Sequence, residues 1–235
     1  GGGPDADIEP ERPLDIEASY RLLFNDALVG HAFFTLAVTP DGAYRIEAFT
    51  VPAGKMARAD GHEVLETSTG RIEPGQVQPQ RFDYSVMDSQ RLEAVSLSFD
   101  WQHNRLQLAA GDQSRDIALL PGTQDRLSYL LVARRLAVTG SGAVTLQVAS
   151  PQATEETLLR VEAAEQVEVP AGRFHALAIH RVTPTADESR TLWFEPGACA
   201  LPLRVLHSAA ENRVEMVLER CGATPQTVAA HSAAE

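Results

Sequence analysis

The sequence has little of what would assign it to a class of protein. It contains only two cysteines among 235 residues, a length at which a chain can bury a core without covalent staples. No stretch approaches the roughly 18 apolar residues of a membrane-spanning helix, so we expect no membrane span. The formal net charge is -12, and the longest basic cluster is Arg134-Arg135. A nucleic-acid partner and an acidic membrane surface are therefore disfavoured.

Motifs that carry a known chemistry are also missing. The chain has no Walker loop and no dinucleotide fingerprint, and Ser128 does not lie on a G-x-S-x-G elbow. The seven histidines are scattered, and His175 and His180 are five residues apart on one expected strand, so they point to opposite faces. We expect no metal site, no cofactor and no catalytic residue. A non-catalytic role is favoured, with a hydrolase built from distant residues as an open alternative.

The two ends of the chain differ in composition from its middle. The sequence begins without Met, which is typical of a processed or engineered chain. Residues 1–16, rich in Pro, Gly, Asp and Glu, are predicted to form a disordered leader, and residues 222–235 a weakly ordered tail. Between them we expect a single β domain over residues 17–221. A boundary inside it is possible at the glycine-containing stretch 139–143.

Period-two alternation of apolar and polar residues runs through most of this middle part. Examples are the segments 82–86, 95–101 and 144–148, each of which would place one apolar and one polar face on a strand. Short turn sequences separate them, such as TPDG at residues 39–42. The pattern predicts a mainly β protein, in which an antiparallel meander closes into a barrel or half-barrel to hide its edges.

One segment, PGTQDRLSYLLVARR at residues 121–135, breaks the alternation. Its leucines Leu127, Leu130 and Leu131 recur with helical spacing. Thr123 is the expected N-cap, and the two arginines would lie in the last turn. The spacing predicts one principal helix over about residues 123–135. We expect it to plug an open end of the barrel, in preference to packing on the outside.

The aromatic residues on the apolar strand faces have two interpretations. The ordinary one is a filled core. The other is that they line a cavity wide enough for a ligand, which the helix closes at one end. On this second interpretation the predicted ligand-binding residues are Phe34, Tyr84, Phe99, Trp101, Leu127 and Leu130.

The two cysteines flank an expected hairpin. A turn at residues 208–212 would join two strands and place Cys199 opposite Cys221. Thiols that face each other across a hairpin are close enough to bridge, so the spacing predicts a Cys199–Cys221 disulfide. The alternative is two unrelated buried thiols.

Several motifs in this order resemble a known family. They are YRLLFNDALVG (20–30), TSTGRIEPGQVQPQRFDY (67–84), SFDW (98–101), GTQDRLSYL (122–130), VPAGRFHALAI (169–179) and TLWFEPGACALPLRV (191–205). Over residues 17–220 the chain resembles the bacterial exported domain of unknown function 3108 family. The resemblance implies a mostly β envelope protein of the periplasm and no assigned reaction. The motif residues, which we expect to be structural, are Gly75, Pro79, Phe82, Asp125, Ser128, Trp193 and Pro202.

Two functions remain in view on this basis. The first is a periplasmic binding or carrier module whose β-barrel holds an apolar or amphipathic ligand, such as a lipid or glycolipid. The second is a scaffold or interaction protein of the cell envelope with a filled core. An interior volume of several hundred Å3 would favour the first.

Overall fold

A computed structural model of the chain describes residues 14–57, 61–88, 90–183 and 188–224. This part of the chain forms a fifteen-stranded sheet, the α-helix α1 (Tyr129–Thr139) and a short 3-10 helix, η1 (Gly54–Ala57). The strands are β1 (Leu14–Phe24), β2 (Ala27–Val38), β3 (Ala43–Pro52), β4 (Glu63–Glu73), β5 (Gln76–Met87), β6 (Leu92–Asp100), β7 (Arg105–Ala110), β8 (Gln113–Ala118), β9 (Gln124–Asp125), β10 (Ala143–Ala149), β11 (Thr154–Val169), β12 (Gly172–Val182), β13 (Glu188–Phe194), β14 (Arg204–Ala209) and β15 (Asn212–Ala223).

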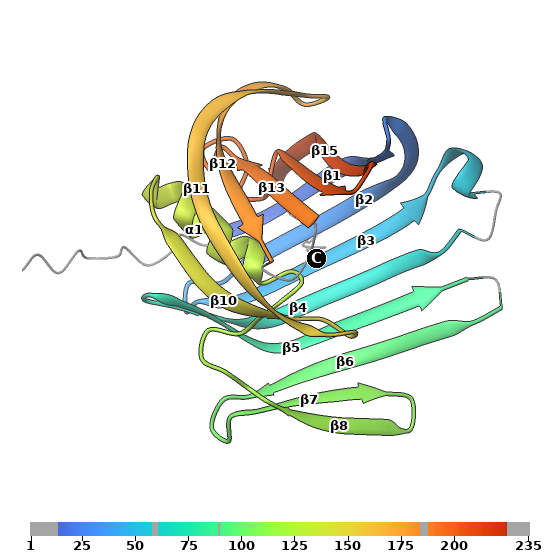
Figure 1. Ribbon diagram of the computed structural model, residues 1–235, viewed down its shortest axis with the longest axis vertical. Coiled ribbons are helices and arrows are strands. Elements are labelled where there is room, and N and C mark those ends of the chain that lie inside the picture. Colours follow the sequence, from blue (N-terminus) through green and yellow to red (C-terminus); the bar gives the residue numbers. More distant parts are fainter. Residues whose placement is uncertain (1–13, 58–60, 89, 184–187, 225–235) are drawn as a thin grey trace, which may run out of the picture.

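The strands follow one another as a meander in two runs, β8 to β1 and β15 to β9, which join where β1 pairs with β15. Neighbouring strands are antiparallel except β9 and β10, which pair in parallel. The expected fold class is therefore confirmed: the protein is mainly β, an antiparallel meander with one principal helix. The sheet curls strongly but does not close, because β8 and β9 remain its outer strands (Figure 1). Of the two predicted forms, it is the half-barrel.

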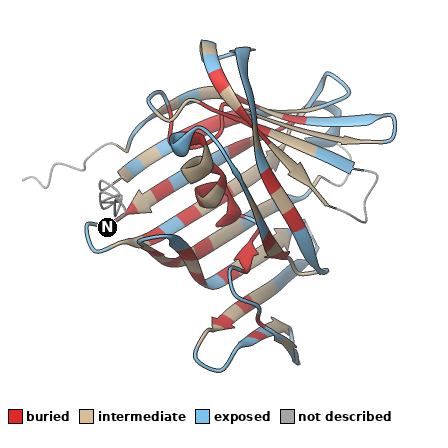
Figure 2. Ribbon diagram, turned by 60° about the vertical axis from the view of Figure 1, so that its left-hand side comes forward, coloured by how far each residue is buried: buried red, intermediate tan, exposed pale blue. Residues whose placement is uncertain are grey.

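The alternation of the sequence sets which face of the sheet is buried. In β3, Tyr44, Ile46 and Ala48 are buried, whereas Arg45 between them is exposed. Figure 2 shows that buried positions recur along the strands and on the helix enclosed by the curl. Side chains of β1–β6, α1 and β10–β15 meet there in a single apolar cluster. Burial of these side chains is the main force that holds the sheet in its curled form.

The strands extend beyond the domain limits expected from composition. β1 begins at Leu14, and β15 runs to Ala223, so residues 14–16 and 222–223 belong to the sheet. They are held in register because Ile16 pairs with both Leu36 and Ala223. Backbone pairing on two sides outweighs the polar composition that predicted a leader and a tail here. Thr224, which follows β15, donates its N–H to the Asp15 carbonyl oxygen at 2.9 Å, and residues 1–13 and 225–235 lie outside the described residues.

The helix begins later than predicted. We expected it over residues 123–135, with Thr123 as N-cap, but α1 spans Tyr129–Thr139 and Ser128 occupies the N-cap position. The hydroxyl of Thr123 donates instead to the carbonyl oxygen of Leu120, and residues 124–125 form β9. The helix ends at Gly140, which adopts the left-handed conformation (φ 79°) that glycine permits and donates its N–H to Leu136. Arg134 and Arg135 consequently lie within the helix.

The helix lies inside the curl of the sheet, as Figure 2 shows. It contacts β11, β12 and β13 on one side and β5 on the other. Leu130, Leu131 and Ala133 are buried in these contacts, and the Arg135 guanidinium donates to the carbonyl oxygen of Glu73 at 2.9 Å. The apolar stripe predicted from the sequence is thus the surface that attaches α1 to the concave face.

Candidate functional site: a cleft beside the disulfide

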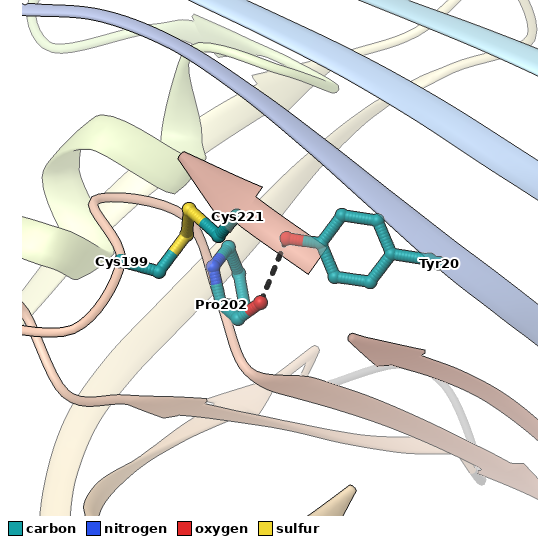
Figure 3. Close-up of a disulfide and its surroundings, with 4 residues drawn as sticks. All are labelled: Tyr20, Cys199, Pro202 and Cys221. Atoms are coloured by element: carbon teal, nitrogen blue, oxygen red, sulfur yellow. Dashed lines mark hydrogen bonds between the residues drawn. A yellow bond between two sulfur atoms is a disulfide. The ribbon is translucent and has the colours of Figure 1, made fainter. Parts of the chain in front are cut away.

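The two cysteines form the predicted disulfide, with a distance of 6.0 Å between their Cα atoms. The predicted hairpin also exists, but its register differs by one residue, since Arg204 pairs with Val217. Cys199 lies in the segment before β14 instead of on a paired strand. The bond therefore ties this irregular segment to β15 (Figure 3).

A second contact holds the same segment. The Tyr20 hydroxyl on β1 donates to the carbonyl oxygen of Pro202 at 2.8 Å (Figure 3). Tyr20 is fully buried, and its burial raises the pKa of the phenol, so the hydroxyl remains a donor at ordinary pH. The segment from Cys199 to Pro202 is thus attached to both β15 and β1, the two strands that join the halves of the sheet.

A cleft of about 830 Å3 opens beside this junction. One wall consists of β1, β2 and β15. The other contains the turn between β11 and β12, together with Ala198 and Leu203 from the segment that carries the disulfide. The N–H of Ala171 in that turn donates to the carbonyl oxygen of Leu218 at 2.9 Å, so the turn is fixed against β15. The cleft lies between elements that are well separated in the sequence.

The walls of the cleft are apolar with a few polar groups. Phe33, Phe34 and Phe174 supply aromatic surface, and Arg220 supplies a guanidinium. Ser19 also lines the cleft, and its buried hydroxyl has no hydrogen-bond partner among the described residues. A buried hydroxyl without a partner is costly, and one in a cleft wall marks a place where a small displacement would let it bond to a ligand or water.

The acidic groups at the cleft are partly neutralised. Glu219 pairs with Arg21 at 2.5 Å and lies 3.8 Å from the His31 ring. Glu17 also lines the cleft, opposite Gly222 in the sheet register. The site thus combines an aromatic surface with charges of both signs, an arrangement that suits an amphipathic molecule.

Of the six predicted ligand-binding residues, only Phe34 lines this cleft. Its ring packs edge-on against Tyr20, with the ring centroids 5.3 Å apart. Leu127 and Leu130 are buried in the core, where they hold the helix and the turn before it. The structure therefore does not bring the six residues together into one cavity.

The other three aromatic residues lie on β5 and near the end of β6. Phe99 and Trp101 stack with ring centroids 6.0 Å apart, and the Trp101 indole donates to the Pro79 carbonyl oxygen at 2.7 Å. Tyr84 lies beneath the guanidinium of Arg126, 5.6 Å from the ring centroid. These three residues follow the alternation that was expected, but in the curled sheet they do not lie beside Phe34.

A buried polar network anchors the start of α1. The Asp125 carboxylate accepts hydrogen bonds from the Ser68 hydroxyl at 2.6 Å and from the backbone N–H groups of Leu127 and Ser128, both at 2.8 Å. The Tyr44 hydroxyl lies 3.0 Å from that of Ser68. Asp125 has no exposed surface, and burial raises its pKa to about 6 against these hydrogen bonds. The network fixes the turn that precedes α1 and attaches it to β3 and β4.

Several of the motif residues have identifiable structural contacts. Asp125 and Ser128 exchange hydrogen bonds in the turn before α1, Pro202 accepts the Tyr20 hydrogen bond, and Phe82 is fully buried. The Trp193 indole donates to Glu165 at 2.5 Å. These contacts are sufficient to explain the residues without a role in chemistry.

Two further findings concern metals and membranes. In residues 14–57, 61–88, 90–183 and 188–224, no three His, Cys, Asp or Glu side chains gather as a metal site would require. Within the same residues, no helix is both long and apolar enough to cross a membrane.

Most of the cleft residues carry no signal in the sequence. Phe33 lies on the face of β2 opposite to Phe34. Phe174 is the third residue of β12, directly after the turn from β11. Their meeting depends on how β11 and β12 arch over β15, which no local pattern encodes. The adjacent pair Phe33-Phe34 was the one available signal, because it places an aromatic side chain on each face of the same strand.

Comparison with known proteins decides the family. The family model described as "Protein of unknown function (DUF3108)" matches residues 19–219. The chain belongs to this family. The match confirms the resemblance inferred from the motifs. It includes α1, Cys199 and most of the residues that line the cleft, whereas Cys221 lies just beyond it.

A solved structure shares the fold. It is the beta-barrel-like protein of domain of unknown function DUF1849 from Brucella abortus, with a TM-score of 0.59 and 10% sequence identity. The match covers 91% of this chain and 99% of that one. At this identity the similarity concerns the fold alone. No curated protein matches the chain.

Proposed function

We propose that this protein is an exported, non-catalytic binding or carrier module that holds an amphipathic ligand, such as a lipid or glycolipid, in the cleft beside the disulfide. The observation that carries the proposal is the cleft itself. Its volume of about 830 Å3 lies within the range of roughly 300–1,000 Å3 usual for small-molecule sites. The aromatic walls would accept the apolar part of the ligand, and Arg220 and Ser19 its polar part.

The disulfide supports a location in the periplasm. Disulfides persist in oxidising compartments and are rare in the reducing cytosol. Cys199 and Cys221 are the only cysteines, and they are bonded to each other. Labelling of intact source cells with a thiol reagent, followed by denaturation, would test this location: two blocked thiols would argue against it, and two oxidised cysteines would support it.

One observation favours the alternative of a scaffold. Leu127, Leu130 and Leu131 are packed into a continuous core, so these leucines border no open cavity. The hollow of about 260 Å3 beside α1 is lined by other helix residues, among them Val132 and Leu136. A filled core is what a scaffold or interaction protein needs. The binding proposal therefore depends on the cleft at β1, β2 and β15, and the test must address that cleft.

The test is native mass spectrometry of the full chain purified from the envelope of its source cells, followed by lipid extraction. We expect a bound amphiphile that is retained through gentle purification. Thr35 is exposed and lines the cleft, so Thr35→Trp should obstruct it and reduce the bound fraction about tenfold. Ser114→Trp on β8 is the matched control, because Ser114 is also an exposed strand residue but does not line the cleft.

The outcomes separate the two functions. Loss of the bound mass in Thr35→Trp, with retention in Ser114→Trp, supports binding in the cleft. Retention in both variants would place any ligand elsewhere. The scaffold would be favoured if the natural protein is purified without a bound molecule and still binds none after incubation with total envelope lipid.

A further inference from the structure

Exposed apolar side chains are concentrated at one end of the strands. Within the described residues, ten large apolar side chains are exposed, and seven of them lie at this end. We name these seven the apolar edge: Phe24, Leu28, Met56, Leu65, Met87, Leu92 and Val214. They lie near the connections between β1 and β2, β3 and β4, β5 and β6, and β14 and β15. The first three of these connections are on the right-hand side of Figure 1.

Several members of the apolar edge are direct neighbours across the sheet. Phe24 pairs with Val214, and Met87 pairs with Leu92. Leu65 pairs with Phe49 of β3, a half-buried residue that also pairs with Phe33. Cross-strand partners have side chains in contact distance on one face. The exposed apolar groups therefore recur in small clusters at the strand ends from β15 across to β6.

This surface includes both faces of the sheet. By alternation along β1, Phe24 lies on the same face as buried Tyr20, which is the concave face. By alternation along β5, Met87 lies on the face opposite to buried Phe82, which is the convex face. A partner that covered only the concave face would leave Met87 exposed, and one that covered only the convex face would leave Phe24 exposed. A partner that meets the strand ends edge-on would cover both.

The charges at this end are largely paired within the protein. Arg213 binds Asp26, Arg91 binds Glu93, and His62 lies 3.6 Å from Asp88. The chain as a whole carries a formal charge of -12. An anionic surface would be repelled by such a protein, so attraction at the apolar edge must come from burial of apolar side chains.

We propose that the apolar edge docks on the surface of a bilayer of zwitterionic phospholipid. The boundary between headgroups and acyl chains of a bilayer is deformable, so it can take up apolar side chains from both faces of a sheet edge at once. A rigid protein partner can do this only with a matching groove. Insertion is limited to side chains at the interface, because the turns at the strand ends carry backbone groups that cannot enter hydrocarbon unpaired. Docking is therefore weak and reversible. This inference does not depend on a ligand in the cleft.

The test is co-sedimentation of the full chain with phosphatidylcholine vesicles. The test variant is the double substitution Met87→Ser and Leu92→Ser, which have exposed fractions of 50% and 65%. The matched control is Leu120→Ser with Val138→Ser, exposed by 50% and 62% but outside the apolar edge. We expect the test variant to lower the partition coefficient about tenfold and the control to change it less than about twofold.

Lipid charge and salt provide an independent measurement. Replacement of part of the phosphatidylcholine by anionic lipid should reduce binding of the natural protein, and added salt should leave binding to pure phosphatidylcholine unchanged. Binding that requires anionic lipid would overturn the proposal. So would natural protein that stays in the supernatant, or an equal loss in the test and control variants.

A reporter variant locates the contact directly. Leu92→Trp should be quenched by brominated phosphatidylcholine, whereas Leu120→Trp should not, after subtraction of the natural tryptophans. Sedimentation velocity examines the competing occupant, a second copy of the chain. Self-association that the double variant abolishes, without vesicle binding by the natural protein, would assign the apolar edge to a dimer contact and reject the bilayer.

Discussion

Two buried ties hold the curled sheet, and they use different chemistry. At the junction of β1 and β15, the Cys199–Cys221 bond and the Tyr20 hydrogen bond hold the segment before β14. At the start of α1, the Asp125 carboxylate and Ser68 attach the helix to β4. The first tie is covalent and insensitive to mild changes in pH, and the second is polar and contains an ionisable group without exposed surface. One fold thus has a redox-sensitive attachment at its cleft and a pH-sensitive one at its helix.

The difference follows from where each tie lies. The segment that carries Cys199 has irregular backbone and borders an open cleft, so few backbone hydrogen bonds hold it and a covalent bond restricts it instead. The start of α1 is enclosed by core residues, where three hydrogen bonds to one carboxylate are strong because water is excluded. Each tie can be broken separately.

Removal of the disulfide should have the largest effect. The bond closes a loop with a sequence separation of 22, for which the chain-entropy model gives about 3 kcal/mol of stabilisation. We expect Cys199→Ser with Cys221→Ser to lower the free energy of unfolding by about that amount, as measured by urea denaturation. The natural protein in reductant is the control and should lose a similar amount. An unchanged denaturation midpoint in both would show that the tie contributes nothing to stability.

The polar tie at Asp125 should make the free energy of unfolding depend on pH. Burial raises the pKa of Asp125 to about 6, above about 3.9 in an unfolded chain. Since the native state holds the proton more tightly, stability from this group is greatest at low pH and is lost as the pH rises from about 4 to about 6. We expect a loss of about 2 kcal/mol between pH 4.5 and pH 6.5.

Asp125→Asn is the matched variant for that measurement. An Asn oxygen can still accept the Leu127 and Ser128 N–H bonds, and its amide can donate to Ser68, whose hydroxyl would then donate to Tyr44. We expect the variant to fold and to lose the part of the slope of stability against pH that Asp125 contributes. The part due to Glu66, whose pKa is also raised by burial, should remain. An identical slope in the natural protein and in Asp125→Asn would mean that Asp125 does not titrate there.

The sequence predicted the elements whose signals are local or nearly local. Alternation such as Tyr44, Ile46 and Ala48 identified the strands, and the hairpin between β14 and β15 led to the disulfide even though the actual register differs by one residue. The helix was found but placed too early. The Asp125 side chain accepts the N–H groups of Leu127 and Ser128, so this acid belongs to the turn that precedes the helix.

The cleft could not be predicted in the same way. Phe34 and Phe174 are on β2 and β12, and they share a cleft because the β11–β12 turn reaches β15, where Ala171 bonds to Leu218. The degree of curl of a large sheet depends on many small twists between strands, which no short pattern specifies. The same curl separates Phe34 from Trp101, although both follow the alternation that predicted a shared cavity.

The smallest expected effect concerns the hydrogen bond within the first tie. Tyr20→Phe removes the donor to the Pro202 carbonyl oxygen and should lower the free energy of unfolding by about 1 kcal/mol. Tyr44→Phe removes a hydroxyl of the same kind from the second tie and is the matched control.

The costs of these two substitutions in free energy of unfolding should respond differently to replacement of the cysteines. Without the disulfide, the segment of Pro202 can shift away from β1, so Tyr20→Phe should cost less in the Cys199→Ser, Cys221→Ser background, by about 0.5 kcal/mol or more. Tyr44→Phe should cost the same in both backgrounds, because no atom of its network contacts that segment. Strict additivity for Tyr20→Phe in this double-mutant cycle would show that the hydrogen bond and the disulfide hold the segment independently, and the first tie would then be two separate attachments.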